Sequence, residues 1–189
     1  MKVNLFWFRR DLRLEDNAAL FEAGKDGLPV LPIFIFDLDD LSEFSLAYVY
    51  RSISDLQNKL AQTGSTLLTF QDKPIPSFEQ VFATYEVAAV FCNREYEPQA
   101  LKRDRSIADL CTARGIPFHT CKDRVIFEGG EITKPDGTPY TVYTPYAKRW
   151  KTRLYASPLP AFDCSSVKFM PHAEEPFRKL SSLASDIAL

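Results

Sequence analysis

Short apolar segments rich in β-forming residues recur through the first two thirds of the chain. Val3 to Phe8 is apolar almost without a break, which is the pattern of a strand buried on both faces of a parallel sheet. A second run follows Pro29 and Pro32, which a strand tolerates near its start. The pattern predicts five strands, at residues 3–8, 33–36, 66–70, 88–92 and 117–121.

Apolar positions at helical spacing lie between these strands. One stripe belongs to a long helix that ends before Gly64. Asp16 is the expected N-cap of a helix over residues 17–23 that Gly24 ends, and Ser77 precedes a shorter helix. The stripe of the long helix consists of Leu46, Val49, Ile53, Leu56 and Leu60.

A further helix is predicted from about Gln99 to Arg114, with Gly115 after it. The residues expected to face inward from it are Leu101, Ala108 and Cys111, and those expected to face water are Lys102, Arg103, Arg105 and Asp109.

Strands and helices therefore alternate five times. This alternation predicts an α/β fold, namely a doubly wound, Rossmann-like parallel sheet of five strands with helices on both faces and right-handed crossovers. The expected strand order is 3-2-1-4-5.

The pattern changes after the fifth predicted strand. Residues 125–133 resemble a hairpin around Gly129-Gly130, and Pro135-Asp136-Gly137 is a second turn. Thr144 is the expected cap of a helix that has Pro145 at its first position and runs to about Tyr155. From Ser157 onward, prolines and small polar residues replace periodicity. We therefore expect an α/β domain over residues 1–155 and an interdomain linker over 156–189, truncated before a further domain.

Composition narrows the possible partners. The chain has 46% hydrophobic and 25% charged residues, and its net charge of −2 creates no global attraction to nucleic acid or membrane. No apolar stretch is long enough to span a membrane. Four cysteines without metal-ligand spacing, and only two histidines, predict reduced thiols in a cytoplasmic protein and no metal site.

The candidate site lies where the strands end. Ligands of doubly wound sheets bind at the carboxyl ends of the strands, beside the switch in strand order, which here falls between the first and fourth strands. Aromatic walls with charged rims suit a planar chromophore or a nucleotide, whereas the same loops could instead carry salt bridges that pin the turns. The residues at these ends are Arg9, Arg10 and Asp11, then Phe36 and Asp37, then Asn93, Arg94 and Glu95.

Several common nucleotide-binding and catalytic motifs are missing from the sequence. No glycine-rich dinucleotide motif follows the first strand, and no P-loop motif occurs. Two histidines make a catalytic triad improbable, so we expect no catalytic residue in this chain.

Two basic clusters need a separate interpretation. The cluster of Lys102, Arg103 and Arg105 fits a solvated helix face. The cluster from Lys148 to Arg153 is interleaved with aromatic residues, which suits either a nucleic-acid groove or a domain interface. The net charge and the predicted linker favour the interface. We therefore expect Tyr143 and Trp150 to be partly exposed, on a surface through which the chain could self-associate.

The opening of the chain resembles a known family. Residues 5–20, LFWFRRDLRLEDNAAL, are similar to the start of DNA photolyases and cryptochromes. Phe34 to Asp37, Asn93 to Pro98 with Arg103-Asp104, and Tyr140 to Tyr146 with Trp150 resemble later family segments in the same order. The resemblance spans roughly residues 3 to 154 and implies the N-terminal domain of such a protein.

The resemblance implies a division of labour. Members hold an antenna chromophore in this domain and FAD in a helical C-terminal domain, and in photolyases the excited flavin splits pyrimidine dimers in damaged DNA. By this resemblance the parent protein is a carbon–carbon lyase acting on DNA, with its own FAD domain as partner, while these 189 residues alone are inactive. Three alternatives to a photolyase domain stay open. The first is the same domain of a cryptochrome photoreceptor, the second a stand-alone nucleotide-binding module, and the third a small nucleic-acid-binding protein.

The resemblance also implies which residues bind the antenna, when the family's binding positions are matched one by one to this sequence. The departures from the family are Ser45, where deazaflavin- and flavin-binding members have arginine, and Ala100, where folate-binding members have glutamate. The antenna is therefore a folate, a deazaflavin, a flavin or absent. The residues expected to bind it are Arg9, Arg10, Asp11, Phe34, Ile35, Phe36, Asp37 and Glu95.

Overall fold

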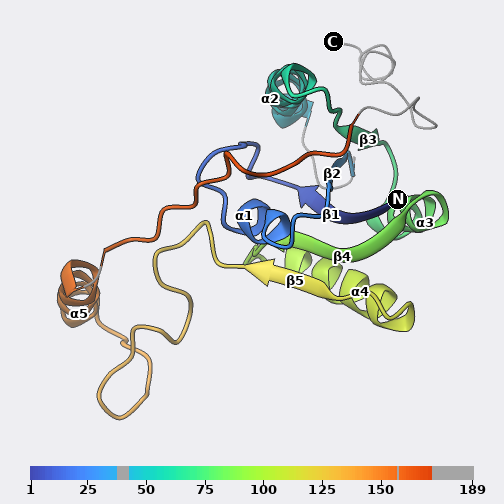
Figure 1. Cartoon of the computed structure of the whole chain (residues 1–189). Coiled ribbons are helices and arrows are strands. Elements are labelled where there is room, and N and C mark those ends of the chain that lie inside the picture. Colours follow the sequence, from blue (N-terminus) through green and yellow to red (C-terminus); the bar gives the residue numbers. More distant parts are fainter. Residues whose placement is uncertain (38–42, 157, 172–189) are drawn as a thin grey trace.

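Five parallel strands form the centre of the molecule (Figure 1). The computed structural model describes residues 1–37, 43–156 and 158–171. Its strand order, β3-β2-β1-β4-β5, is the order expected from the sequence, so the doubly wound fold is confirmed. The strands are β1 Lys2–Phe8, β2 Val30–Ile35, β3 Leu68–Phe70, β4 Glu86–Asn93 and β5 Phe118–Cys121.

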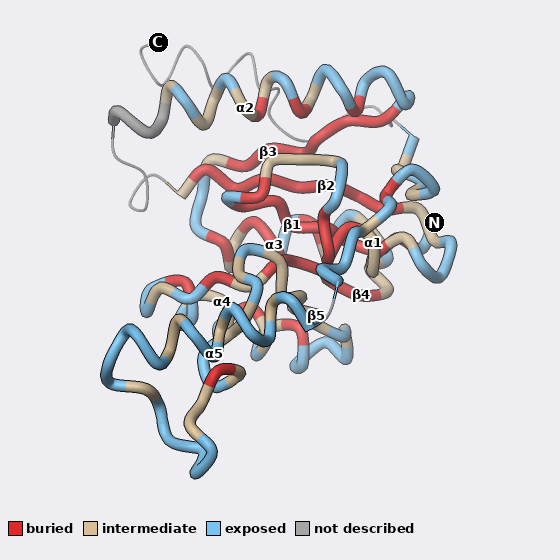
Figure 2. Tube along the Cα trace, turned by 90° about the vertical axis from the view of Figure 1, so that its left-hand side faces the viewer, coloured by how far each residue is buried: buried red, intermediate tan, exposed pale blue. Residues whose placement is uncertain are grey.

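Two helices cover each face of the sheet. Because side chains alternate along a strand, Phe6 and Phe8 of β1 pack on one side with α1 and α2, whereas Leu5 and Trp7 pack on the other with α3 and α4. Strand β2 is consequently buried throughout, and β1 is buried from Val3 onward (Figure 2). The helices are α1 Ala18–Gly24, α2 Glu43–Gln62, α3 Pro74–Thr84 and α4 Pro98–Ala113.

Three helix starts differ from the prediction, one of them that of α5, Tyr143–Ala156, which begins before its expected cap Thr144. The N-cap of α1 is Asn17, whose side-chain oxygen accepts a hydrogen bond from the Leu20 N–H, and not Asp16, whose φ is +45°. Helix α3 begins a turn before Ser77, because Pro74 occupies its first turn, where a missing N–H costs nothing.

The orientation of α4 was also predicted incorrectly in part. Cys111 is buried as expected, but Leu101 is 53% exposed, and Ile107 is fully buried in its place. Arg103 does not simply face water, since its side chain is only 20% exposed. The apolar and charged residues of α4 alternate too closely for spacing alone to identify the buried stripe.

A long excursion follows β5. The predicted hairpin over residues 125–133 is absent, and the only pairing described there is an isolated bridge between Thr133 and Pro139. The turn at Gly137 is present, with φ +82°. Helix α5, Tyr143–Ala156, has no buried residue and stands apart from the sheet (Figure 1).

Residues 158–171 return from α5 to the sheet, as Figure 1 shows. The Phe162 N–H donates to Asp16 Oδ1 at 3.0 Å, and the buried Cys164 packs beside α1. Further on, the Val30 N–H donates to the Lys168 carbonyl, and Phe169 bridges β2. This segment therefore packs on the α/β core, although a division into a domain over 1–155 and a linker over 156–189 stays a prediction.

Candidate functional site

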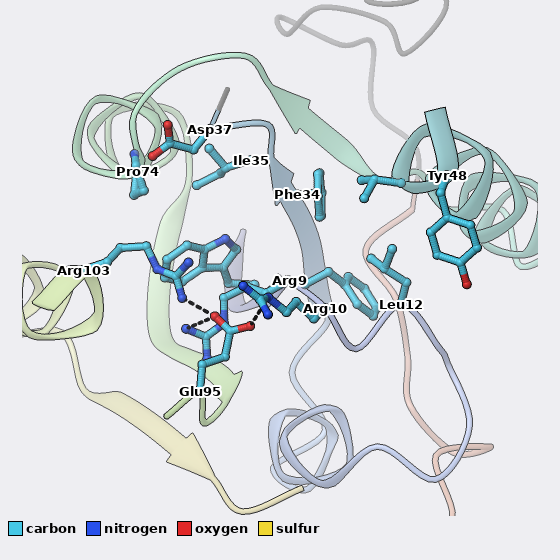
Figure 3. A pocket seen from close by; sticks show the side chains of 13 residues that line it. Arg9, Arg10, Leu12, Phe34, Ile35, Asp37, Tyr48, Pro74, Glu95 and Arg103 are labelled. Atoms are coloured by element: carbon cyan, nitrogen blue, oxygen red, sulfur yellow. Dashed lines mark hydrogen bonds and ion pairs between the residues drawn. The ribbon is translucent and has the colours of Figure 1, made fainter. Parts of the chain in front are cut away.

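A cavity of about 660 Å³ opens at the carboxyl ends of β1, β2 and β4 (Figure 3). This is the place at which a doubly wound sheet binds its ligands, next to the switch point between β1 and β4. Helix α2 forms one wall, and α4 contributes a side chain from the opposite wall. The lining residues are Trp7, Phe8, Arg9, Arg10, Leu12, Phe34, Ile35, Asp37, Tyr48, Val49, Pro74, Glu95 and Arg103.

The inner part of the cavity is apolar and aromatic. Phe34 and Ile35 at the end of β2 are buried, and Trp7 packs edge-to-face on Phe78 of α3 with 5.1 Å between ring centroids. Tyr48 of α2 stands at the mouth and is 75% exposed. Such walls suit a flat, largely apolar ligand.

The polar side of the cavity centres on the buried carboxylate of Glu95. Arg103 Nη2 lies 2.5 Å from Glu95 Oε2, and Arg9 Nη1 lies 3.6 Å from the same oxygen. Arg10 Nε and Arg124 Nη1 approach Oε1 at 3.4 and 3.6 Å, yet Oε1 has no hydrogen-bond partner among the described residues. The dashed lines in Figure 3 show how Arg9, Arg10 and Arg103 converge on Glu95.

Arg9 stays charged although it is buried. Burial alone would lower the pKa of its guanidinium, but Cys92, Asp104 and Glu95 outweigh that effect and raise it. Arg9 Nη1 lies 2.5 Å from Asp104 Oδ1, and its other terminal nitrogen donates to the Asn93 carbonyl. Arg9 and Arg103 both lie 5.0 Å from the centroid of the Trp7 ring, so two cations border the aromatic wall.

A buried polar network holds the loop between β1 and α1. Asn93 Nδ2 donates to Asp11 Oδ2 and to Asn17 Oδ1, while its own Oδ1 accepts from the Ala19 N–H. Asp11 Oδ1 in turn accepts from the Arg9 N–H at 2.9 Å. The glycine-free loop is therefore shaped by side chains, and this shape directs Arg9 and Arg10 toward the cavity.

The structure brings most of the expected site residues together. Asp11 and Phe36 do not line the cavity. Asp11 accepts a hydrogen bond from the Arg9 N–H within the loop after β1, and Phe36 is part of the hydrophobic core. Among the lining residues that the sequence interpretation missed, Arg103 could have been suspected from its place eight residues after Glu95. The expected site residues that do line the cavity are Arg9, Arg10, Phe34, Ile35, Asp37 and Glu95.

Other expectations concern residues outside the cavity. Tyr143 is 79% exposed and Trp150 is partly exposed, so the predicted exposure of both is confirmed. Trp150 also packs edge-to-face on Phe127. Ala100 is buried in α4, and Ser45 lies in the first turn of α2, where side chains fall outside the description. Within the described residues no cluster of histidines, cysteines and carboxylates could hold a metal ion, and no helix has the length and apolarity needed to cross a membrane.

The strand order and the cavity at its switch point define a domain of the doubly wound, Rossmann-like α/β class. The profile of the DNA photolyase family matches residues 4–165, and the chain therefore belongs to that family.

Curated proteins with similar sequences include a photo-lyase. An uncharacterized 31.6 kDa protein from Synechococcus sp. (strain PCC 6716) is 33% identical over 84% of this chain and 57% of its own length. The deoxyribodipyrimidine photo-lyase of Synechococcus sp. (strain ATCC 27144) is 31% identical over 82% of this chain but only 33% of its own length. The chain thus spans little more than half of the first relative and a third of the second.

Solved structures share the fold. A bacterial class III photolyase from Agrobacterium tumefaciens superposes with a TM-score of 0.81 at 24% identity, covering 97% of this chain and 38% of that one. An archaeal photolyase from Sulfolobus tokodaii, described with two FAD molecules and a novel light-harvesting cofactor, gives a TM-score of 0.78 at 22% identity over 98% and 41% of the two chains.

Proposed function

We propose that this chain is the light-harvesting domain of a photolyase, and that it binds a planar antenna chromophore in the cavity beside Glu95. The observation that carries the proposal is the combination of an aromatic wall with a rim of arginines at the switch point of the sheet. An antenna needs only to be bound, oriented and shielded from water, so no acid, base or nucleophile is required of the domain.

The residues present fit such a group. Trp7 and Phe34 offer aromatic contact and Val49 aliphatic contact, and Arg10, whose side chain is 54% exposed, can meet an anionic group at the rim. Glu95 Oε1 has two arginines within ion-pair distance but accepts no hydrogen bond among the described residues, so it is a buried acceptor that an N–H or O–H of the ligand would satisfy. Flavins, deazaflavins and folates all combine a fused ring with such polar edges.

Flavin-type antennas are favoured by one comparison. The Sulfolobus tokodaii photolyase, described with two FAD molecules, has the same domain fold. A folate is favoured less, because Ala100 offers no carboxylate. Ser45 in place of an arginine leaves the anionic part of a flavin to Arg10.

In the whole protein, we propose that the bound antenna passes excitation energy to FAD held by a C-terminal domain, which then repairs pyrimidine dimers in DNA. Tyr143 and Trp150 of α5 would pack on that domain, and the four free cysteines favour a cytoplasmic location. Loss of dimers under blue light by the full-length parent tests repair; light responses without repair would indicate a cryptochrome instead.

The antenna role is tested by absorbance of the purified chain after incubation with a folate, a deazaflavin, FMN and FAD in turn. A retained, shifted band with one of them supports the proposal. Arg10→Ala should weaken that chromophore's binding by roughly tenfold or more, the worth of a charged hydrogen bond. Arg114→Ala is the matched control. Arg114 also forms an ion pair with an exposed carboxylate, that of Glu79, but it follows the end of α4 and does not line the cavity. Retention of AMP or ATP alone would indicate a nucleotide-binding module.

A further inference from the structure

Helix α5 differs in charge from the other four helices that the structure describes. It carries four basic residues and no aspartate or glutamate, whereas α1, α2, α3 and α4 each contain at least one carboxylate. The chain as a whole has a net charge of −2, so this concentration of positive charge is local. The basic residues are Lys148, Arg149, Lys151 and Arg153.

Most of these charges have no internal role. Arg153 is engaged, since it donates to the Glu131 carbonyl and lies over the Phe127 ring at 5.2 Å. Lys148, Arg149 and Lys151 are exposed and form no ion pair with any described carboxylate. Interaction with the helix dipole does not explain Lys148 and Arg149, because they lie in the middle of the helix rather than in its last turn.

The exposed lysines share one face of the helix. Ala147, Trp150 and Leu154 are partly buried, and this side of α5 packs on its own preceding loop through Trp150 and Phe127. Lys148 and Lys151 are three residues apart and therefore neighbours on the remaining surface. Tyr155, four residues after Lys151 and 81% exposed, continues the same face.

We propose that this face of α5, formed by Lys148, Lys151 and Tyr155, contacts the phosphate backbone of DNA without reading its sequence. Unpaired lysines on a rigid element are the groups that neutralise phosphates, and an exposed aromatic ring beside them offers a surface for stacking on a base. Charge complementarity selects a polyanion, since α5 contains no carboxylate that would repel it. Helix α4 lacks this character because Asp104 and Asp109 lie among its basic residues.

The inference is independent of the chromophore cavity, so the two proposals fail separately. The test is fluorescence anisotropy of a labelled duplex of arbitrary sequence, titrated with the whole chain at several salt concentrations. Binding should weaken steeply with salt, and Lys148→Ala/Lys151→Ala should reduce the slope of log affinity against log salt by about 2, or about 1 for each lost phosphate contact. The loss should be the same for duplexes of different sequence.

Lys102→Ala/Arg105→Ala is the matched control, because these two residues are exposed and three apart on α4. It should leave the slope unchanged, and circular dichroism should show that both double variants are folded. An unchanged slope in the α5 variant, or an equal reduction in both variants, overturns the proposal. Binding of poly-glutamate as tightly as DNA also overturns it, and would point to an acidic protein as the partner.

Discussion

Glu95 and Arg103, eight residues apart in the chain, meet at the wall of the cavity with 2.5 Å between Oε2 and Nη2. Glu95 leaves β4 toward the cavity, and Arg103 reaches back to it from the second turn of α4. The carboxylate is only 3% exposed, so its charge is compensated by arginines rather than by water. This pair joins the segment after β4, which borders the cavity, to helix α4, whose Arg103 lines it.

Removing the charge of Glu95 should destabilise the domain. We expect Glu95→Gln to lower the free energy of unfolding by about 3 kcal/mol, because Arg9 and Arg103 would lose a buried counter-charge. Urea unfolding followed by circular dichroism measures this. Glu97→Gln is the control: Glu97 pairs with Arg10 but is 43% exposed, so its loss should cost less than about 1 kcal/mol. Equal effects of the two substitutions would show that the Glu95 cluster is not a structural centre.

Gly24 permits the return segment to lie against α1. A Cβ at position 24 would be 2.8 Å from Val167 Cγ2. Gly24→Ala should therefore destabilise the protein by about 1–3 kcal/mol through overpacking, despite the better helix propensity of alanine. The double variant Gly24→Ala/Val167→Ala should recover part of this loss in urea unfolding. A single Gly24→Ala variant as stable as the wild type would mean that residues 158–171 do not pack as described.

The loop after β5 should loosen in acid. Hydrogen bonds from Lys122 and from the Glu128 N–H hold the pKa of Glu131 below its ordinary value of 4.5. Because the pKa is depressed in the folded state, this stabilisation is complete above about pH 4.5 and is lost as the pH falls through the folded pKa. The backbone amides of residues 122–142 should therefore lose protection from hydrogen exchange at acid pH. In the Glu131→Gln variant the same amides should be less protected, and their protection should change less with pH. Identical pH profiles would refute this role.

The cysteines should differ in reactivity. Burial raises the pKa of the Cys92 thiol to about 12 and that of Cys111 to about 11, and the thiolate is the reactive form. Burial raises the pKa of Cys164 as well, and that thiol is buried beside α1. At neutral pH an alkylating reagent should modify Cys121 first, because it alone is partly exposed. Mass spectrometry of the native and the urea-unfolded protein checks the order; early labelling of Cys92 would contradict it.

The sequence interpretation failed where residues distant in the chain decide the outcome. Asp16 satisfies every local rule for an N-cap, but its side chain accepts from Phe162, and Asn17 caps α1 while bonding to Asn93. The segment around Phe162 lacks periodicity because its few apolar residues fill gaps on a core that already exists. No local pattern marks such a segment as packed.

The periodicity of apolar residues by itself determined the fold class and the five strands, because continuous apolar strands alternating with helices leave few other ways to bury both. The strand order was an expectation from the common pattern of doubly wound sheets, and the pairing of strands in the folded chain decides it. The residues that follow the strands likewise indicated where the candidate site lies, because parallel strands bring their carboxyl ends to one edge of the sheet. Only the tertiary structure decided which of these residues line the cavity. Asp11 and Arg10 are neighbours in the chain, yet Asp11 is held by a hydrogen bond from Asn93 while Arg10 lines the cavity, because burial of polar groups requires partners that only the folded chain supplies.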